Sequence, residues 1–177
     1  RVRLSYEKMK AIGLSLYMTI EDMSMLAEKF RGCYSDPILL HDNAATTLLT
    51  IHLNLVIGTL SRYVQGRNDL WSLINDLLSF RTFGQFLLTE QGHGLDAKSL
   101  DTTATWLPTG GFCLHAPSPQ AVKYMPPTIP IGIPCIGPVF ARLIVNGVSH
   151  GVRPFIVDLN DGTHICDRFT ARCEHSV

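Results

Sequence analysis

The hydrophobic period of the chain changes once, near residue 80, and this change limits the folds that it can adopt. Before it, apolar residues recur every three to four positions, as in "TIEDMSMLAEKF", where Thr19 and Asp22 suit the start of a helix. The stretch 43–63 is apolar on nearly every side and predicts a helix buried among others. A further helix is predicted over "NDLWSLINDLLSF". Residues 1–80 are therefore expected to form a helical layer.

After Phe80 the pattern becomes typical of strands. Short runs rich in β-branched and aromatic residues are separated by Gly, Pro and Asn: "TFGQFLLTE", "SLDTTATWLP", "GFCLHA", "PVFARLIVN" and "VRPFIVDL". The sequences at 109–111 and 146–151 suit hairpin turns, because glycine and Asn-Gly tolerate the positive φ that tight turns need. Helices followed by antiparallel strands predict an α+β fold.

The composition describes a core-forming chain without net charge. Of 177 residues, 46% are hydrophobic and 17% are charged, and 15 basic residues balance 15 acidic ones. No global field therefore attracts nucleic acid, which we do not expect as a partner. No uninterrupted apolar run approaches the roughly eighteen residues of a membrane span. The first residues, "RVRLSYEKMK", lack the apolar segment of a secretory signal and an initiator Met, which favours a trimmed or partial chain.

The sequence disfavours disulfide bonds, a metal site and a serine-hydrolase site. The five cysteines are odd in number and form no C-x-x-C pair, which indicates reduced thiols and an intracellular location, and no spacing predicts a metal site. His52 is interpreted as hydrogen-bonded within the helical layer. The sequence 147–151 matches G-x-S-x-G of serine hydrolases, but that motif needs a helix after the serine, and "VRPFIVDL" predicts a strand.

The stretch "LLTEQGHGLD", residues 87–96, combines an apolar run with a hydroxyl and two glycines. Glycine lets the backbone take positive φ or lets a ligand approach closely. The Thr89 hydroxyl and the N–H groups of the turn could form a row of donors for a planar polar edge, such as that of an isoalloxazine ring. A plain structural turn is the alternative.

Three motifs in order give the chain a family resemblance. They are "FLLTEQGHGLDAKSLDTTATW", "GFCLHAPSPQAVKYMPP" and "VFARLIVNGVSHGVRPFIVDLND". From about residue 85 to 161 the chain resembles the acyl-CoA oxidase branch of the acyl-CoA dehydrogenase superfamily, particularly its fungal oxidase-like members. The resemblance implies an N-terminal helical domain (1–80), an antiparallel β-barrel-like middle domain (81–161) and a divergent tail (162–177). The C-terminal helical bundle of the family is absent from this chain.

The resemblance also implies a chemistry. A glutamate removes the α-proton of a fatty acyl-CoA or related acyl thioester, FAD takes the β-hydride, and O2 reoxidises the flavin to give H2O2 and a trans-2-enoyl-CoA. By the same resemblance, Gly94 and Leu95 contact the substrate. The implied cofactor-binding residues are Thr89, Gly92, Gly94, Pro127 and Thr128. We expect an intracellular protein, with the peroxisome as one candidate organelle, and association into homo-oligomers through an exposed apolar face.

The chain departs from the family pattern at several positions. Pro126 and Pro127 stand where oxidases have Pro-Gly, and proline has no N–H to donate, although the Thr128 hydroxyl could replace that donor. Leu95 stands where dehydrogenases carry a serine. Glu90 is expected to be a structural hydrogen-bonding residue, and no residue here can be named as the catalytic base. Where the family usually has two adjacent aromatic residues, this chain has "KYM", which leaves one ring, Tyr124, near the cofactor.

These observations lead to two interpretations. The first is a fragment or truncated form of an acyl-CoA oxidase-like flavoenzyme, inactive alone. The second is a non-catalytic, degenerate domain that keeps the fold for binding or assembly. A flavin spectrum of the purified chain distinguishes them.

Overall fold

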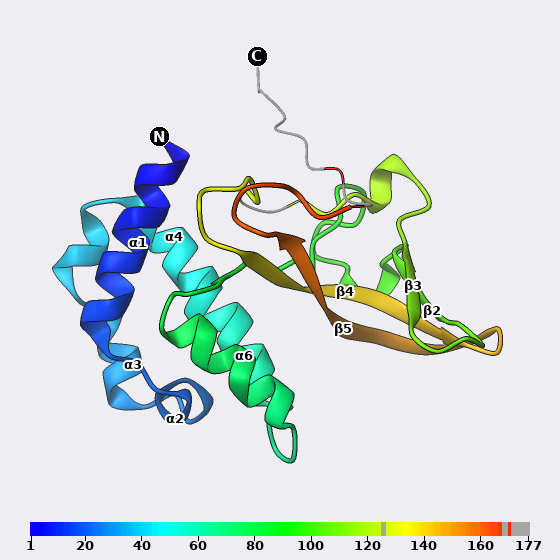
Figure 1. Ribbon diagram of the computed structural model, residues 1–177, viewed down its shortest axis with the longest axis horizontal. Helices are drawn as coiled ribbons and strands as arrows, with labels where there is room; N and C mark the ends of the chain where they lie inside the picture. The colour runs from blue at the N-terminus through cyan, green and yellow to red at the C-terminus, as the bar shows by residue number, and fades with distance from the viewer. Residues whose placement is uncertain (125–126, 168–169, 171–177) are drawn as a thin grey trace. The chain divides into compact units, whose positions relative to one another are not determined.

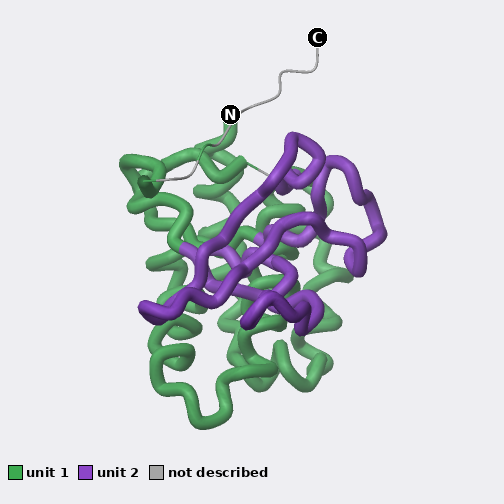
Figure 2. Tube along the Cα trace, turned by 90° about the vertical axis from the view of Figure 1, so that its right-hand side faces the viewer, with its two compact units in different colours: residues 1–85, 127–136, 158–177 green, residues 86–126, 137–157 purple. Residues whose placement is uncertain are grey.

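The computed structural model describes residues 1–124, 127–167 and 170. The chain divides into two compact units, each built from separate stretches of sequence (Figure 2). Unit 1 comprises residues 1–85, 127–136 and 158–177, and unit 2 comprises residues 86–126 and 137–157. The helical layer predicted for residues 1–80 lies within unit 1.

The α-helices described here all belong to unit 1 (Figure 1). They are α1 (Val2–Leu16), α2 (Ile20–Ser24), α3 (Glu28–Cys33), α4 (Asn43–Thr50), α5 (Gly58–Ser61) and α6 (Asn68–Leu78). Shorter or wider helical turns are η1 (Pro37–Leu40) and η2 (Ile51–Ile57) in unit 1, and η3 (Ala97–Ser99) and η4 (Pro119–Ala121) in unit 2.

The predicted start of a helix at Thr19 is confirmed. The Thr19 side chain accepts a hydrogen bond from Asp22 N–H at 3.2 Å, and the Asp22 carboxylate accepts one from Thr19 N–H at 2.9 Å. This reciprocal capping satisfies two N–H groups that the first turn leaves unpaired. The run does not continue as one helix, because Leu26 takes a left-handed φ of 49° between α2 and α3.

The apolar stretch 43–63 forms the central helix of unit 1, as predicted. The Asp42 side chain caps it, and α4, the π-helical η2 and α5 follow without a break. By length and composition the run Asn43–Ser61 would pass as a membrane span, but 56% of that window is buried inside the protein. A core helix of a soluble protein meets the same test, so the run is weak grounds for a span.

His52 lies at the centre of the helical core and is fully buried. Its Nε2 lies 3.0 Å from Leu77 O, and its Nδ1 accepts a hydrogen bond from Gly84 N–H at 3.0 Å. The ring stacks on Phe80 with centroids 4.7 Å apart. This geometry agrees with the predicted role of a histidine hydrogen-bonded within the layer.

The strands form one open, mixed sheet. They are β1 (Phe83–Gly84), β2 (Thr103–Trp106), β3 (Phe112–His115), β4 (Cys135–Val145) and β5 (Val148–Asn160), in the order β1-β4-β2-β3 with β5 also paired to β4. Within unit 1, β1 pairs in parallel with the start of β4. Within unit 2, β2 pairs in parallel with β4 and antiparallel with β3.

The α+β class is therefore confirmed, but the antiparallel barrel is wrong. The hairpin turns predicted the β2–β3 pair correctly, since Trp106 lies opposite Phe112. They could not predict that two segments distant in sequence would pair with β4 in the same direction. Such pairings depend on long crossover connections, which leave no local sequence signal.

The G-x-S-x-G match has no elbow geometry. Asn146 and Gly147 form the turn between β4 and β5 with φ values of 50° and 78°. Ser149 and His150 lie exposed within β5, which continues to Asn160 without a helix. The hydrolase interpretation is therefore excluded for this serine, because a nucleophile elbow joins a strand to a helix.

Candidate functional site

The glycine turn, residues 89–96, lies in unit 2 and follows two isolated bridges at its start. The expected strand "TFGQFLLTE" reduces to β1 and to isolated bridges from Leu87 to Val139 and from Glu90 to Lys123. Thr89 is half-buried, its carbonyl accepts a hydrogen bond from Tyr124 N–H at 3.0 Å, and its hydroxyl has no partner among the described residues. The hydroxyl is therefore available to a ligand.

Glu90 holds the base of the glycine turn. Its carboxylate is 1% exposed and accepts hydrogen bonds from Asp101 N–H at 2.8 Å and Thr102 N–H at 3.0 Å. The Thr102 hydroxyl donates a third bond at 2.5 Å, and Lys123 Nζ a fourth at 2.9 Å. A buried carboxylate persists only when its oxygens are paired in this way.

Lys123 completes this ion pair. Besides Glu90, its ammonium donates to Leu88 O at 3.1 Å and Phe140 O at 2.8 Å, so all three of its N–H groups are used. His93 lies against the same carboxylate, with Nδ1 2.9 Å from Glu90 Oε2, but this atom makes no hydrogen bond among the described residues. The cluster therefore ties the turn to three separate backbone segments.

The hydrogen bonds decide the charge of Glu90. Burial alone would raise the pKa of this carboxyl, but donation from Thr102, Asp101 and Lys123 outweighs burial and lowers the pKa to about 2. Burial lowers the pKa of Lys123, and the nearby carboxylate opposes that shift. A permanently ionised and saturated carboxylate is a poor general base, in agreement with the structural role expected for Glu90.

Gly92 is required by packing. A Cβ at this position would lie 2.5 Å from Gln120 Cβ, closer than side chains approach one another. Its N–H donates to Gln120 O at 2.8 Å, and Gln91 N–H donates to Val122 O at 2.9 Å. The N–H of Gly92 is therefore already used, although the resemblance places this residue beside the cofactor.

The tip of the turn carries two N–H groups without an acceptor among the described residues. Gly94 takes a φ of 47° and Leu95 is fully exposed. The N–H groups of these two residues have no acceptor within the part of the chain that the structure describes. With the Thr89 hydroxyl they form an uncharged donor set, which suits the carbonyl and imine acceptors of a flavin or the carbonyl of a thioester.

Pro127 and Thr128 belong to unit 1. The Pro127 carbonyl accepts a hydrogen bond from the Tyr6 hydroxyl at 2.6 Å, and the Thr128 carbonyl accepts one from Asn160 Nδ2 at 2.7 Å. Among the described residues, the N–H and hydroxyl of Thr128 have no partner. Pro126 lies outside the described residues. The predicted cofactor residues thus fall in both units.

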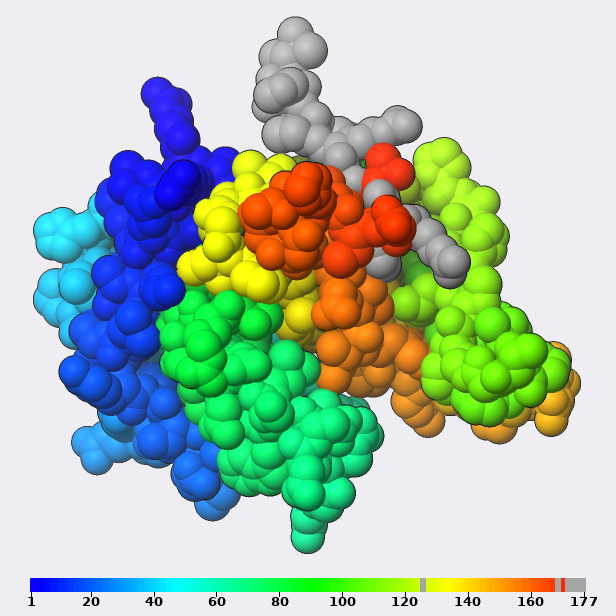
Figure 3. All heavy atoms as spheres, in the orientation of Figure 1, coloured from blue at the N-terminus to red at the C-terminus, as the bar shows by residue number. Residues whose placement is uncertain are grey.

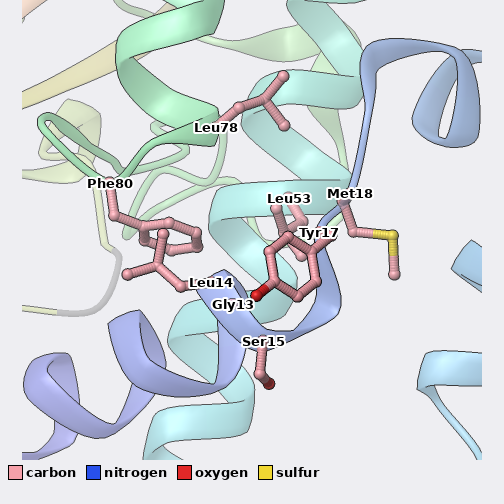
Figure 4. A pocket seen from close by; sticks show the side chains of 8 residues that line it. All are labelled: Gly13, Leu14, Ser15, Tyr17, Met18, Leu53, Leu78 and Phe80. Atoms are coloured by element: carbon pink, nitrogen blue, oxygen red, sulfur yellow. The ribbon is translucent and has the colours of Figure 1, made fainter.

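A cavity of about 520 Å³ lies elsewhere in unit 1 (Figure 4). Its lining is largely apolar and includes Leu14, Tyr17, Leu53, Leu78 and Phe80. None of the residues predicted to bind cofactor or substrate contributes to it. The cavity therefore gives no support to the predicted site.

The chain is similar in sequence and in structure to known proteins. No protein-family model matches the chain. Human peroxisomal acyl-coenzyme A oxidase 3 is 30% identical over 169 residues, which are 89% of this chain and 22% of the human protein. The crystal structure of acyl-CoA oxidase 1 from Yarrowia lipolytica superposes with a TM-score of 0.72 and 26% identity, over 92% of this chain and 23% of that one.

The chain is acyl-CoA oxidase-like. The resemblance inferred from its motifs is confirmed, and the chain spans about a fifth of the length of the oxidases it matches. An acyl-CoA oxidase-1 from Caenorhabditis elegans, solved in complex with FAD and ATP, shares the fold at a TM-score of 0.50 and 22% identity.

The acyl-CoA oxidase-like chain contains functional candidates that its sequence did not reveal. Lys123 gave one weak signal, a lone lysine in the apolar run "QAVKYM" that a buried carboxylate would explain. Thr102, Tyr6 and Asn160 gave none, because their roles depend on contacts with residues between 12 and 121 positions away. Sequence spacing does not encode such contacts.

Proposed function

We propose that this chain is part of an FAD-dependent oxidoreductase of the acyl-CoA oxidase type, which dehydrogenates a fatty acyl-CoA with O2 as the acceptor. When bound, FAD would accept the β-hydride and pass two electrons to O2, so that the acyl-CoA becomes a trans-2-enoyl-CoA and O2 becomes H2O2. The observation that carries this proposal is a row of donors on the glycine turn of an acyl-CoA oxidase-like chain, which have no partner among the residues that the structure describes.

Each residue predicted to bind cofactor or substrate takes a proposed part, and Glu90 and Lys123 support them. The Thr89 hydroxyl donates to the flavin ring, and the Gly94 and Leu95 N–H groups face the flavin edge or the acyl thioester. Gly92 serves by letting the turn approach Gln120. Thr128 supplies the donor that Pro127 lacks. Glu90 and Lys123 keep the turn in place without taking part in proton transfer.

We also propose a place for the catalytic base, the limits of the domains and the oligomeric state. We place the catalytic glutamate outside this chain, which should not turn over substrate alone. We keep 1–80 and 81–161 as the helical and middle β domains, with 162–177 as the tail. Exposed apolar side chains, among them Met25, Leu40 and Tyr17, would favour homo-oligomers. A peroxisomal location is proposed from relatives with that location in their names.

A chimaera tests the proposed activity. The matching segment of Yarrowia lipolytica acyl-CoA oxidase 1 is replaced by this chain, and FAD content and acyl-CoA-dependent H2O2 release are measured. We expect a yellow protein that produces H2O2, and Thr89→Val should reduce FAD retention. A folded chimaera that stays colourless with added FAD would contradict the proposal and favour a degenerate domain kept for binding or assembly.

A further inference from the structure

The segment Pro127–Pro130, called the strap here, is held by its carbonyl groups. It belongs to unit 1, where Tyr6 and Asn160 each donate a hydrogen bond to one of its carbonyls. Figure 3 shows the yellow atoms of 127–133 lying against the orange and red atoms of 158–165. Two residues beyond the strap, Gly132 N–H donates to Gly162 O at 2.7 Å.

Both donors are themselves fixed. Tyr6 is 2% exposed, its ring stacks on Phe83 at a centroid distance of 5.0 Å, and its hydroxyl also accepts a hydrogen bond from Gln85 Nε2. Asn160 is 3% exposed and its Oδ1 accepts from Gly162 N–H at 3.0 Å. Neither side chain can change its direction without leaving a buried polar group unpaired.

Peptide geometry then sets the direction of the strap's donors. The peptide unit is planar and trans, so its N–H points opposite to its carbonyl. With the Pro127 carbonyl directed at Tyr6, the Thr128 N–H points away from Tyr6. With the Thr128 carbonyl directed at Asn160, the Ile129 N–H points away from Asn160. Neither N–H has an acceptor within the described residues.

The strap therefore presents two successive N–H groups and the Thr128 hydroxyl, while the Pro127 and Thr128 carbonyls are hydrogen-bonded to Tyr6 and Asn160. Pro127 and Ile129 are exposed and Thr128 is half-exposed, so these donors are accessible. Proline at 127 and 130 supplies no N–H and restricts the backbone, which lowers the entropy lost on binding. A row of uncharged donors suits the acceptor-rich edge of a planar heterocycle.

We propose that Tyr6 and Asn160 are positioning residues, which orient the N–H groups of Thr128 and Ile129 toward the acceptor edge of a flavin ring. This inference rests on the proposed function and deepens it, because it assigns roles to side chains from α1 and from the end of β5. It also explains how a Pro-Pro sequence can serve where a glycine N–H would otherwise donate.

The test uses the whole chain with FAD as the probe. Amide proton shifts of Thr128 and Ile129 are followed by NMR as FAD is added, and affinity is measured by quenching of flavin fluorescence. In the wild type we expect both amide protons to move downfield. Tyr6→Phe and Asn160→Asp should each weaken FAD binding about tenfold and reduce these shifts, with a native circular dichroism spectrum.

Tyr63→Phe is the matched control, because it removes a hydroxyl from an exposed tyrosine that makes no side-chain hydrogen bond among the described residues. It should bind FAD as the wild type does. Binding by the wild type that leaves the Thr128 and Ile129 amide shifts unchanged would overturn the inference, even if both variants failed to fold. Unchanged affinity in folded variants would overturn it too, and in both cases the proposed function stands. No FAD binding by the wild type would instead overturn the proposed cofactor role, and the inference with it.

Discussion

Units 1 and 2 both bury polar side chains, but they bury them in different charge states. In unit 1, the His52 ring is fully enclosed and its pKa falls to about 4, because burial disfavours the imidazolium more than the Leu77 carbonyl favours it. In unit 2, Glu90 is equally enclosed, yet four hydrogen bonds keep it ionised beside Lys123.

The difference lies in the number and kind of partners. His52 has one carbonyl and one N–H as partners, which a neutral imidazole satisfies fully: Nε2–H donates to Leu77 and Nδ1 accepts from Gly84. The four hydrogen-bond partners of Glu90 are all donors, one of them charged, and a neutral carboxyl would leave some of them unpaired. Burial by itself therefore does not set charge; the surrounding donors and acceptors do.

Among the substitutions considered, truncation of Glu90 should lower the unfolding free energy of unit 2 the most. Glu90→Ala leaves the Lys123 ammonium buried without its counter-charge, and we expect unit 2 to lose about 3–5 kcal/mol of unfolding free energy. Urea unfolding would be followed by the fluorescence of Trp106, which is the only tryptophan left in a Trp71→Phe background.

Glu7→Ala, in unit 1, is the exposed-pair control, and its unfolding is followed by Trp71 in a Trp106→Phe background. Glu7 pairs with Arg3 at 3.0 Å, but both side chains are largely exposed, so a change of at most about 1 kcal/mol is expected. If Glu90→Ala and Glu7→Ala cost the same, the buried ion pair does not stabilise unit 2 and the contrast with unit 1 fails.

The pH dependence of stability should separate the two units. The folded pKa of His52 lies below its usual 6.5, so the unfolded chain binds the proton first, and unit 1 loses stability as the pH falls from about 6.5 to 4. The full loss is roughly 3 kcal/mol. Glu90 has a folded pKa of about 2 against 4.5, so its loss in unit 2 begins only below about pH 4.5.

Trp71 reports on unit 1 and Trp106 on unit 2, so single-tryptophan variants measure each unit at every pH. His52→Gln should remove the dependence between pH 6.5 and 4 in unit 1. If the unfolding free energy of that variant still falls between pH 6.5 and 4, another group causes the fall. The claim that His52 is buried in its neutral form would then lose its support.

A methyl group at Gly92 should have an intermediate effect. The new Cβ would overlap Gln120 Cβ, and we expect Gly92→Ala to cost about 1–3 kcal/mol in unit 2, as overpacking usually does. Gly32→Ala is a matched control, because nothing lies within 4 Å of its Cβ and α3 continues through it. A neutral Gly92→Ala would mean that the Glu90 cluster alone sets the position of the turn.

The sequence predicted most of the helical layer, because each helix there carries its own signals. The Thr19 cap, the apolar run from Asn43 and the leucine stripe after Asn68 are local features, and local hydrogen bonds realise them. The sheet was predicted only where hairpins join neighbouring strands. The parallel pairings of β4 with β1 and β2 join residues some 40 to 50 positions apart, which hydrophobic period does not encode.

In the candidate site, too, the sequence predicted local features and missed long-range contacts. The motif around Thr89 predicted where the turn lies, but it could not show that Gly92 N–H donates to Gln120 while those of Gly94 and Leu95 have no acceptor among the described residues. Nor could it show that Lys123 forms an ion pair with Glu90. These facts depend on how separate segments meet, which makes the residues that anchor the turn harder to predict than the turn itself.

The smallest effect on stability is expected at the tip of the glycine turn. Leu95 is fully exposed, so Leu95→Ser should change the unfolding free energy of unit 2 by no more than about 0.5 kcal/mol. If Leu95 faces a substrate, the same substitution in the Yarrowia chimaera should raise KM for acyl-CoA without loss of FAD. Leu40→Ser, at a strongly exposed residue of unit 1, should change neither. A large loss of stability in Leu95→Ser would show that the tip packs against protein, and a residue held in that way is not free to meet a ligand.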